Sequence, residues 1–213
     1  MDRTKLRLYA VTDRAWAADG DSFFRQVAAA IAGGADIVQL REKHLDPQAF
    51  LTEAKRFVAL CREQGALSII NDSAEIAAQA GADGVHVGQE DMAASNVRRR
   101  VGGRMMIGVS VHSVEEALEA VNSGADCLGV GAMFATATKA DAPVLPLETL
   151  RDICRAVPVP VVAIGGIGKE NMMRLAGSGV AGVALVSAIF AAEDIEKECR
   201  ELRVRAEQMV NTP

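Results

Sequence analysis

The sequence predicts an α/β fold, a closed (β/α)8 barrel that forms a single domain over residues 1–213. Three observations predict it. Eight short apolar runs, typical of buried parallel strands, alternate with amphipathic helical segments. A Gly-Ala-Asp pattern recurs at Gly34, Gly81 and Gly124, and the length is close to the ~250 residues of a typical TIM barrel. An open doubly wound sheet is the alternative, because alternation of strands and helices does not prove closure.

The predicted strands are short, and each ends at polar residues. They cover residues 6–11, 37–40, 68–70, 85–87, 105–109, 127–130, 159–164 and 183–186. The Gly-Ala-Asp pattern precedes three of them, and a degraded copy starting at Gly179 precedes the last. A glycine at such a joint takes the left-handed conformation that ends a helix, and a parallel strand begins a few residues later. The pattern therefore indicates a repeated βα unit.

Helices are predicted from start signals and from apolar faces. Asp21 or Ser22 would cap the first helix, Pro47 occupies a favoured first position, and Ser113 and Glu116 have the spacing of a capping box. The predicted ranges are 23–32, 47–63, 75–80, 113–122, 147–156, 170–176 and 194–210.

Composition limits the class of protein. The net charge of -5 argues against a nucleic-acid partner, and no apolar run approaches the ~20 residues of a membrane span. The four cysteines and three histidines have no metal-site spacing, so we expect the cysteines to be small buried residues. We expect a cytoplasmic protein that binds small molecules, with no membrane partner; a homo-oligomer is left open.

Two acidic residues follow neighbouring predicted strands. Asp72 and Asp91 would emerge side by side, because parallel neighbours lie roughly 5 Å apart. Two carboxylates that close repel unless a cation lies between them. Mg2+ fits, because it takes one or two protein carboxylates together with water and phosphate oxygens. The alternative is that each acid caps the helix that follows it. Considered as a pair, they favour a magnesium site and a phosphorylated substrate.

Other predicted strand ends carry groups suited to phosphate. Arg41 and Lys43 follow the second strand, and Lys139 lies beside two threonines after the sixth. Gly165-Gly166 and Val186-Ser187 follow strands seven and eight, where barrels frequently bind phosphate through backbone N–H groups. Solvated loops and tight turns are the alternative interpretation. Two phosphate sites would mean two substrates or one bisphosphate.

Seven strings in order resemble the thiamine-phosphate synthase family, from about Leu8 to Phe190. They are Gln39-Leu40-Arg41-Glu42-Lys43, Ile70-Asn71-Asp72, Gly84-Val85-His86-Val87-Gly88-Gln89-Glu90-Asp91, Gly108-Val109-Ser110, Thr136-Ala137-Thr138-Lys139, Ala163-Ile164-Gly165-Gly166-Ile167 and Val186-Ser187-Ala188-Ile189. The resemblance implies a transferase that condenses hydroxymethylpyrimidine diphosphate with hydroxyethylthiazole phosphate. The products would be thiamine phosphate and pyrophosphate, with Mg2+ as cofactor.

The resemblance also implies roles for the matching residues. Asp72 and Asp91 would bind Mg2+, and Arg41, Ser110 and Lys139 would be catalytic. Gln39 and the backbone around Leu40 and Glu42 would frame the pyrimidine. The diphosphate would contact Arg41, Lys43, Asn71, Ser110 and Lys139, and the thiazole phosphate would lie against Thr136, Ala137, Thr138, Gly166, Val186 and Ser187.

Two alternative functions stay open. A thiazole tautomerase-like paralogue would share the barrel but would not need Asp72, Asp91, Arg41 and Lys139. A non-catalytic barrel that binds a thiamine precursor would keep all of them. The family often has proline where this chain has Ala132, Ala135 and Ala140, so we expect an altered Km or an altered order of this loop, and not a lost reaction.

Overall fold

The computed structural model describes residues 3–89, 91, 93–136, 138 and 143–212, and its strands form a closed parallel barrel. The strands are β1 (Leu8–Val11), β2 (Ile37–Leu40), β3 (Leu67–Asn71), β4 (Gly84–Val87), β5 (Met106–Val111), β6 (Cys127–Val130), β7 (Val161–Ile164) and β8 (Gly182–Leu185). They follow one another in chain order, and β1 pairs with β8. The predicted (β/α)8 barrel is confirmed, and the open sheet is wrong.

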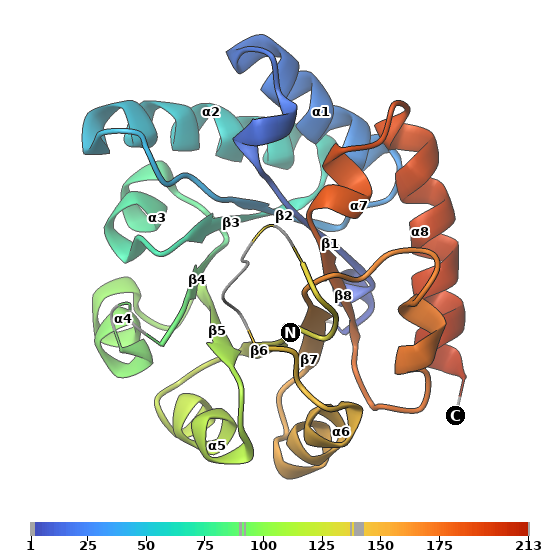
Figure 1. Cartoon of the computed structure of the whole chain (residues 1–213). Coiled ribbons are helices and arrows are strands. Elements are labelled where there is room, and N and C mark those ends of the chain that lie inside the picture. The colour runs from blue at the N-terminus through green and yellow to red at the C-terminus, as the bar shows by residue number, and fades with distance from the viewer. Residues whose placement is uncertain (1–2, 90, 92, 137, 139–142, 213) are drawn as a thin grey trace.

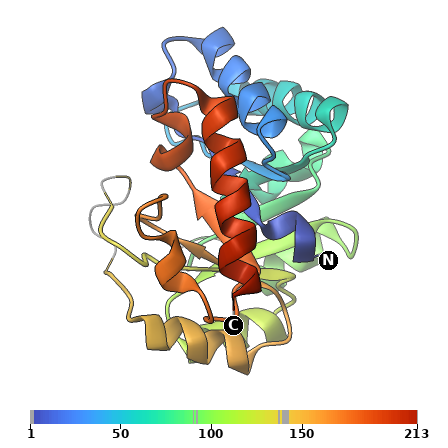
Figure 2. The ribbon, with the colours of Figure 1, turned by 90° about the vertical axis from the view of Figure 1, so that its right-hand side faces the viewer.

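Helices surround the ring of strands (Figure 1). They are α1 (Gly20–Ala32), α2 (Pro47–Gln64), α3 (Ala74–Ala80), α4 (Ala94–Val101), α5 (Val114–Asn122), α6 (Leu147–Ala156), α7 (Ser187–Phe190) and α8 (Ile195–Asn211), with 3-10 helices η1 (Arg3–Leu6), η2 (Arg14–Trp16) and η3 (Met172–Leu175). Figure 2 shows α8 lying along the outside of the barrel. Within the described part of the chain, none of these helices has the length and apolarity required to cross a membrane.

Several element boundaries differ from the predictions. The first helix begins at Gly20 and is capped by Asp19, whose carboxylate accepts the Ser22 N–H at 2.6 Å, so the expected cap at Asp21 or Ser22 is wrong. The helix predicted over 170–176 is only the 3-10 helix η3. Just before it, the side-chain oxygen of Asn171 accepts a hydrogen bond from the Gly168 N–H, an arrangement typical of a turn. No residue range was predicted from the sequence for α4 or for α7.

The barrel has an inner and an outer apolar layer. Along β2, Ile37 lies in the interior cluster, whereas Val38 and Leu40 pack between the strands and the helices. This alternation is the period of two that a strand imposes on its side chains. The interior cluster contains Leu6, Tyr9, Val11, Ile37, Ile69, Val162, Ala181 and Ala184.

The glycines of the three Gly-Ala-Asp joints have the predicted left-handed conformation. Gly34, Gly81 and Gly124 have φ of 105°, 69° and 96°, the left-handed region that ends a helix. The aspartates after two of them bind the neighbouring strand: Asp83 accepts the Ser68 N–H and Asp126 accepts the Ile107 N–H, both at 2.8 Å. These contacts hold the amino-terminal ends of the strands and leave the carboxyl ends for the site.

Candidate active site at the carboxyl ends of the strands

A cavity of about 720 Å³ lies at the carboxyl ends of the strands and extends into the barrel. It brings together most of the residues predicted from the sequence. On the side of β2 to β5 it is lined by Gln39, Arg41, Lys43, Asn71, Asp72, Asp91 and Ser110. On the side of β6 to β8 it is lined by Thr136, Thr138, Gly166, Val186 and Ser187.

A few predicted site residues are placed elsewhere. The Leu40 side chain is buried in the outer core, and the Glu42 side chain, only 4% exposed, accepts a hydrogen bond from Arg14 Nε at 2.8 Å. The prediction for Leu40 and Glu42 concerns their backbone groups, and it stays a prediction. Ala137, Lys139 and Ala140 lie outside the described residues.

The two predicted metal ligands lie on neighbouring strand ends. β3 and β4 pair in parallel, and the Asp72 N–H donates to the His86 carbonyl at 2.8 Å. Asp72 has φ of 65°, a left-handed conformation that aspartate tolerates better than most residues. Its Oδ2 lies 2.6 Å from Lys43 Nζ. Partial burial and the nearby Asp72 carboxylate raise the pKa of Asp91.

The capping alternative for these acids is wrong. The cap of α3 is Ser73, whose hydroxyl accepts the Ile76 N–H at 3.2 Å. The carboxylate of Asp91 accepts the Gly88 N–H at 2.7 Å, and α4 begins at Ala94 without a side-chain cap.

The acid pair suits a hard cation. Two carboxylates held close together, with one ammonium already against them, form a donor set that Mg2+ can complete with water and phosphate oxygens. Within the described ranges no group of three or more His, Cys, Asp or Glu side chains is arranged to hold a metal.

Deep in the cavity the amide of Gln39 is held by Tyr9. Gln39 Nε2 donates to the Tyr9 hydroxyl at 2.8 Å, and both side chains are buried. Burial raises the pKa of Tyr9, so the phenol stays protonated. With its nitrogen engaged, Gln39 presents its carbonyl oxygen as an acceptor. The sequence named Gln39 but gave no indication of its partner.

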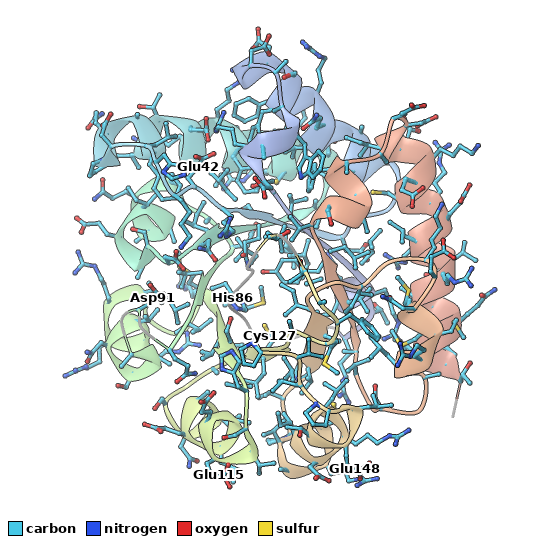
Figure 3. The ribbon with its side chains drawn as sticks, viewed as in Figure 1. Glu42, His86, Asp91, Glu115, Cys127 and Glu148 are labelled. Atoms are coloured by element: carbon cyan, nitrogen blue, oxygen red, sulfur yellow. The ribbon has the colours of Figure 1, made fainter. Side chains whose placement is uncertain are left out.

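His86 is a site residue that sequence reasoning missed. Its Nε2 lies 2.9 Å from the Ser110 hydroxyl oxygen, and Figure 3 shows the residue within the ring of strands. Burial lowers the pKa of His86 to about 4, with the Asp72 charge acting in the opposite direction, so the ring is neutral at pH 7. The signal was present: a histidine between Val85 and Val87 on a predicted strand points to the opposite face from two core residues.

The opposite wall of the cavity is formed by the two loops that follow β6 and β7, which are hydrogen-bonded to each other. The backbone N–H groups of Met133 and Phe134 donate to the carbonyls of Ile164 and Gly165 at 2.9 and 3.0 Å. Gly166 has φ of 64°, and its carbonyl accepts Asn171 Nδ2 at 2.8 Å. A Cβ on Gly166 would lie 2.4 Å from the carbonyl oxygen of Ala135. Glycine is therefore required where the two loops meet.

The chain is similar to known proteins over most of its length. A family model described as thiamine monophosphate synthase matches residues 8–189. The thiamine-phosphate synthase of Chloroflexus aurantiacus is 46% identical over 92% of this chain and 91% of its own length. The thiamine-phosphate synthase of Pyrococcus furiosus is 42% identical over 98% of both.

Among solved structures, a thiamine phosphate pyrophosphorylase from Pyrococcus furiosus superposes with a TM-score of 0.89 at 40% identity, covering 98% of this chain and 99% of its own. Family model, relatives and structure agree over nearly the whole chain. The chain therefore belongs to the thiamine monophosphate synthase family.

Proposed function

We propose that this protein condenses hydroxymethylpyrimidine diphosphate with hydroxyethylthiazole phosphate, giving thiamine phosphate and pyrophosphate. The observation that carries the proposal is that Asp72 and Asp91, which follow adjacent strands, line the same cavity as Gly166, with Lys43 bound to Asp72. One wall of the cavity carries charged groups that suit a diphosphate. The opposite wall contains Gly166 and suits the phosphate of a second substrate. Relatives 42–46% identical carry the name of this activity.

The proposal includes Mg2+ held by Asp72 and Asp91. When bound, the ion would neutralise charge on the diphosphate and so make it a better leaving group. Asp72 is already oriented by its backbone hydrogen bond to His86, and Asp91 by the Gly88 N–H. These fixed orientations lower the cost of organising the ligands when substrate binds.

The departing diphosphate is stabilised by side chains at the ends of β2 and β5. The bond between the pyrimidine methylene carbon and the diphosphate oxygen breaks, and its electron pair leaves with the diphosphate. Arg41 lines the cavity, and its guanidinium forms no ion pair with any other described residue, so it is available to the phosphates. Lys43 and the Ser110 hydroxyl add a charge and a donor. Lys139, from the sequence, would add a second ammonium.

The second substrate supplies the new bond. The thiazole nitrogen donates its lone pair to the methylene carbon, so no general base is needed. Thr136, Thr138 and Ser187 offer hydroxyl donors on the Gly166 side of the cavity for the thiazole phosphate. The acceptor oxygen of Gln39, fixed by Tyr9, suits the amino group of the pyrimidine. Holding both substrates in one cavity supplies the remaining rate enhancement by proximity.

The test is pyrophosphate release by the purified protein with both substrates and Mg2+, and with each of the three omitted in turn. Release that requires all three supports the proposal. Asp91→Asn should move the Mg2+ activation curve to higher concentration, whereas Glu119→Gln, on the exposed face of α5, should leave it unchanged. No release by a folded protein, or equal release with chelator present, contradicts the proposal.

Lys139→Ala provides a separate arm. We expect slower turnover with little change in the affinity for thiazole phosphate, because an ammonium beside the leaving group acts in the transition state. Normal turnover by this variant would remove Lys139 from the mechanism.

A further inference from the structure

The hydrogen bond between His86 and Ser110 joins two neighbouring strands inside the barrel. His86 lies opposite Gly108 in the β4–β5 register, and Ser110 is two residues further along β5 on the same face. The His86 Nε2 is 2.9 Å from the Ser110 Oγ. The other ring nitrogen, Nδ1, is buried and has no hydrogen-bond partner among the described residues.

Two glycines leave room for the ring in this position. A Cβ on Gly108 would lie 2.4 Å from His86 Nδ1, and a Cβ on Gly129 would lie 3.2 Å from its Cε1. The imidazole therefore occupies space that β5 and β6 leave open only because these positions lack side chains. The ring therefore packs closely against the backbone of both strands.

The buried Nδ1 decides which tautomer is present. A buried N–H without an acceptor costs more than a buried lone pair without a donor, and nearly every buried N–H in proteins is paired. The proton therefore belongs on Nε2, where it can be donated to the Ser110 oxygen. With the opposite tautomer, Nε2 would accept the serine proton and hold it away from the cavity.

We propose that His86 is a positioning residue that donates from Nε2 to Ser110 Oγ and thereby turns the serine proton toward the substrate. Ser110 then meets the diphosphate as a hydrogen-bond donor. This inference deepens the proposed function and rests on it. It assigns His86 no proton transfer: the ring keeps its proton throughout, and its effect is exerted through the serine.

A double-mutant cycle tests the coupling. His86→Leu removes the donor while keeping an apolar side chain against the two glycines, and His86→Gln supplies an amide N–H near the position of Nε2. We expect His86→Leu and Ser110→Ala each to lower kcat by about 10- to 100-fold, the loss typical of one donor to a charged group. The double variant should be no slower than the slower single variant, and His86→Gln should retain kcat within about threefold.

Other outcomes overturn the proposal. Losses that multiply in the double variant would show that His86 acts independently of Ser110. A His86→Gln enzyme as slow as His86→Leu, with both melting at the temperature of the unmodified protein, would show that ring shape and not donation matters. The Km for thiazole phosphate should stay unchanged in all variants.

A measurement without turnover separates this inference from the proposed function. The nitrogen NMR shifts of histidine-labelled protein report which ring nitrogen is protonated, and His86→Gln identifies the resonances. We expect protonation at Nε2. A proton at Nδ1 would overturn the role of His86 even in an active synthase, whereas Nε2 protonation in a protein that releases no pyrophosphate would contradict the function alone.

Discussion

The ammonium nitrogen of Lys43 lies 2.6 Å from Oδ2 of Asp72, across the ends of β2 and β3. The two side chains are 46% and 29% exposed, so the pair contributes under ~1 kcal/mol to folding. Its effect is instead on the cavity, where one cation lies against the carboxylate that faces Asp91. Lys43 therefore contributes more to the charge of the cavity than to the stability of the fold. When a metal ion binds Asp72, or a phosphate binds Lys43, the ion pair between Lys43 and Asp72 would be replaced.

Lys43→Met should weaken use of the diphosphate substrate. Loss of one charged contact corresponds to about 1.5–3 kcal/mol, so kcat/Km for pyrimidine diphosphate should fall by about 10- to 100-fold. The Km for thiazole phosphate should change little, since Lys43 lies on the wall opposite Gly166. Initial rates with each substrate varied in turn check this, with Lys55→Met, on the exposed face of α2, as control. Equal effects on both substrates would contradict it.

Gly166→Ala should damage the opposite wall. The position has φ of 64°, and an added Cβ would meet the carbonyl oxygens of Ala135 and Phe134 at 2.4 and 2.6 Å. We expect the Km for thiazole phosphate to rise by at least about tenfold, because displacement of a substrate-positioning loop is costly. Gly168→Ala is the matched control, since its Cβ would meet nothing within 4 Å. An unchanged Km in Gly166→Ala would show that this loop does not hold the phosphate.

Arg14→Ala should loosen the segment that carries Arg41 and Lys43. Arg14 forms ion pairs with Glu42 and Glu53 and lies 4.6 Å above the Phe23 ring. Its removal leaves the enclosed Glu42 carboxylate without its cation, so we expect the free energy of unfolding to fall by about 1–3 kcal/mol. Urea unfolding measures this change, and the Km for pyrimidine diphosphate should rise with it.

Arg56→Ala is the control for the Arg14 variant. Arg56 also forms an ion pair and lies over a phenylalanine ring, but its ion-pair partner Asp21 is exposed and the ring belongs to Phe24, both on α1 outside the strands. It should lower stability by under ~1 kcal/mol and leave both Km values unchanged. Equal losses in the two variants would contradict a role for Arg14 in holding the β2–α2 connection.

Buried cysteines predict an alkaline loss of stability. Burial raises the pKa of Cys61, Cys127 and Cys199 to about 12, and nearby acidic side chains add to the rise. In the unfolded chain these thiols ionise near ~8.5. Because the folded pKa is the higher one, stability is fully present below the unfolded pKa and is lost as pH rises toward 12, by about 1–2 kcal/mol per thiol at pH 10.

Two measurements check the cysteine prediction. Urea unfolding at pH 8 and pH 10 should show the loss, and replacing Cys61 and Cys199 with alanine should reduce it. A thiol reagent at pH 8 should modify the native protein slowly, with the partly buried Cys154 first, and all four cysteines rapidly in denaturant. Fast modification of Cys127 in the native protein would contradict its burial.

Local patterns in the sequence determined the architecture and half of the site. Apolar runs and the Gly-Ala-Asp joints specify parallel strands, because a left-handed glycine ends a helix wherever it occurs. Asp72 and Asp91 could be paired in advance, since consecutive strands of a barrel are neighbours and their carboxyl ends meet at one rim. The same reasoning located Arg41, Lys43 and Gly166 in the cavity.

Only the tertiary structure decided which side chains support those residues. His86 with Ser110, Tyr9 with Gln39 and Arg14 with Glu42 each join separate elements. Such contacts depend on strand register and on the space that Gly108 and Gly129 leave inside the barrel. Sequence periodicity fixes which face a side chain takes, but a hydrogen bond also requires a distance near 3 Å, and that distance is set only when the barrel closes.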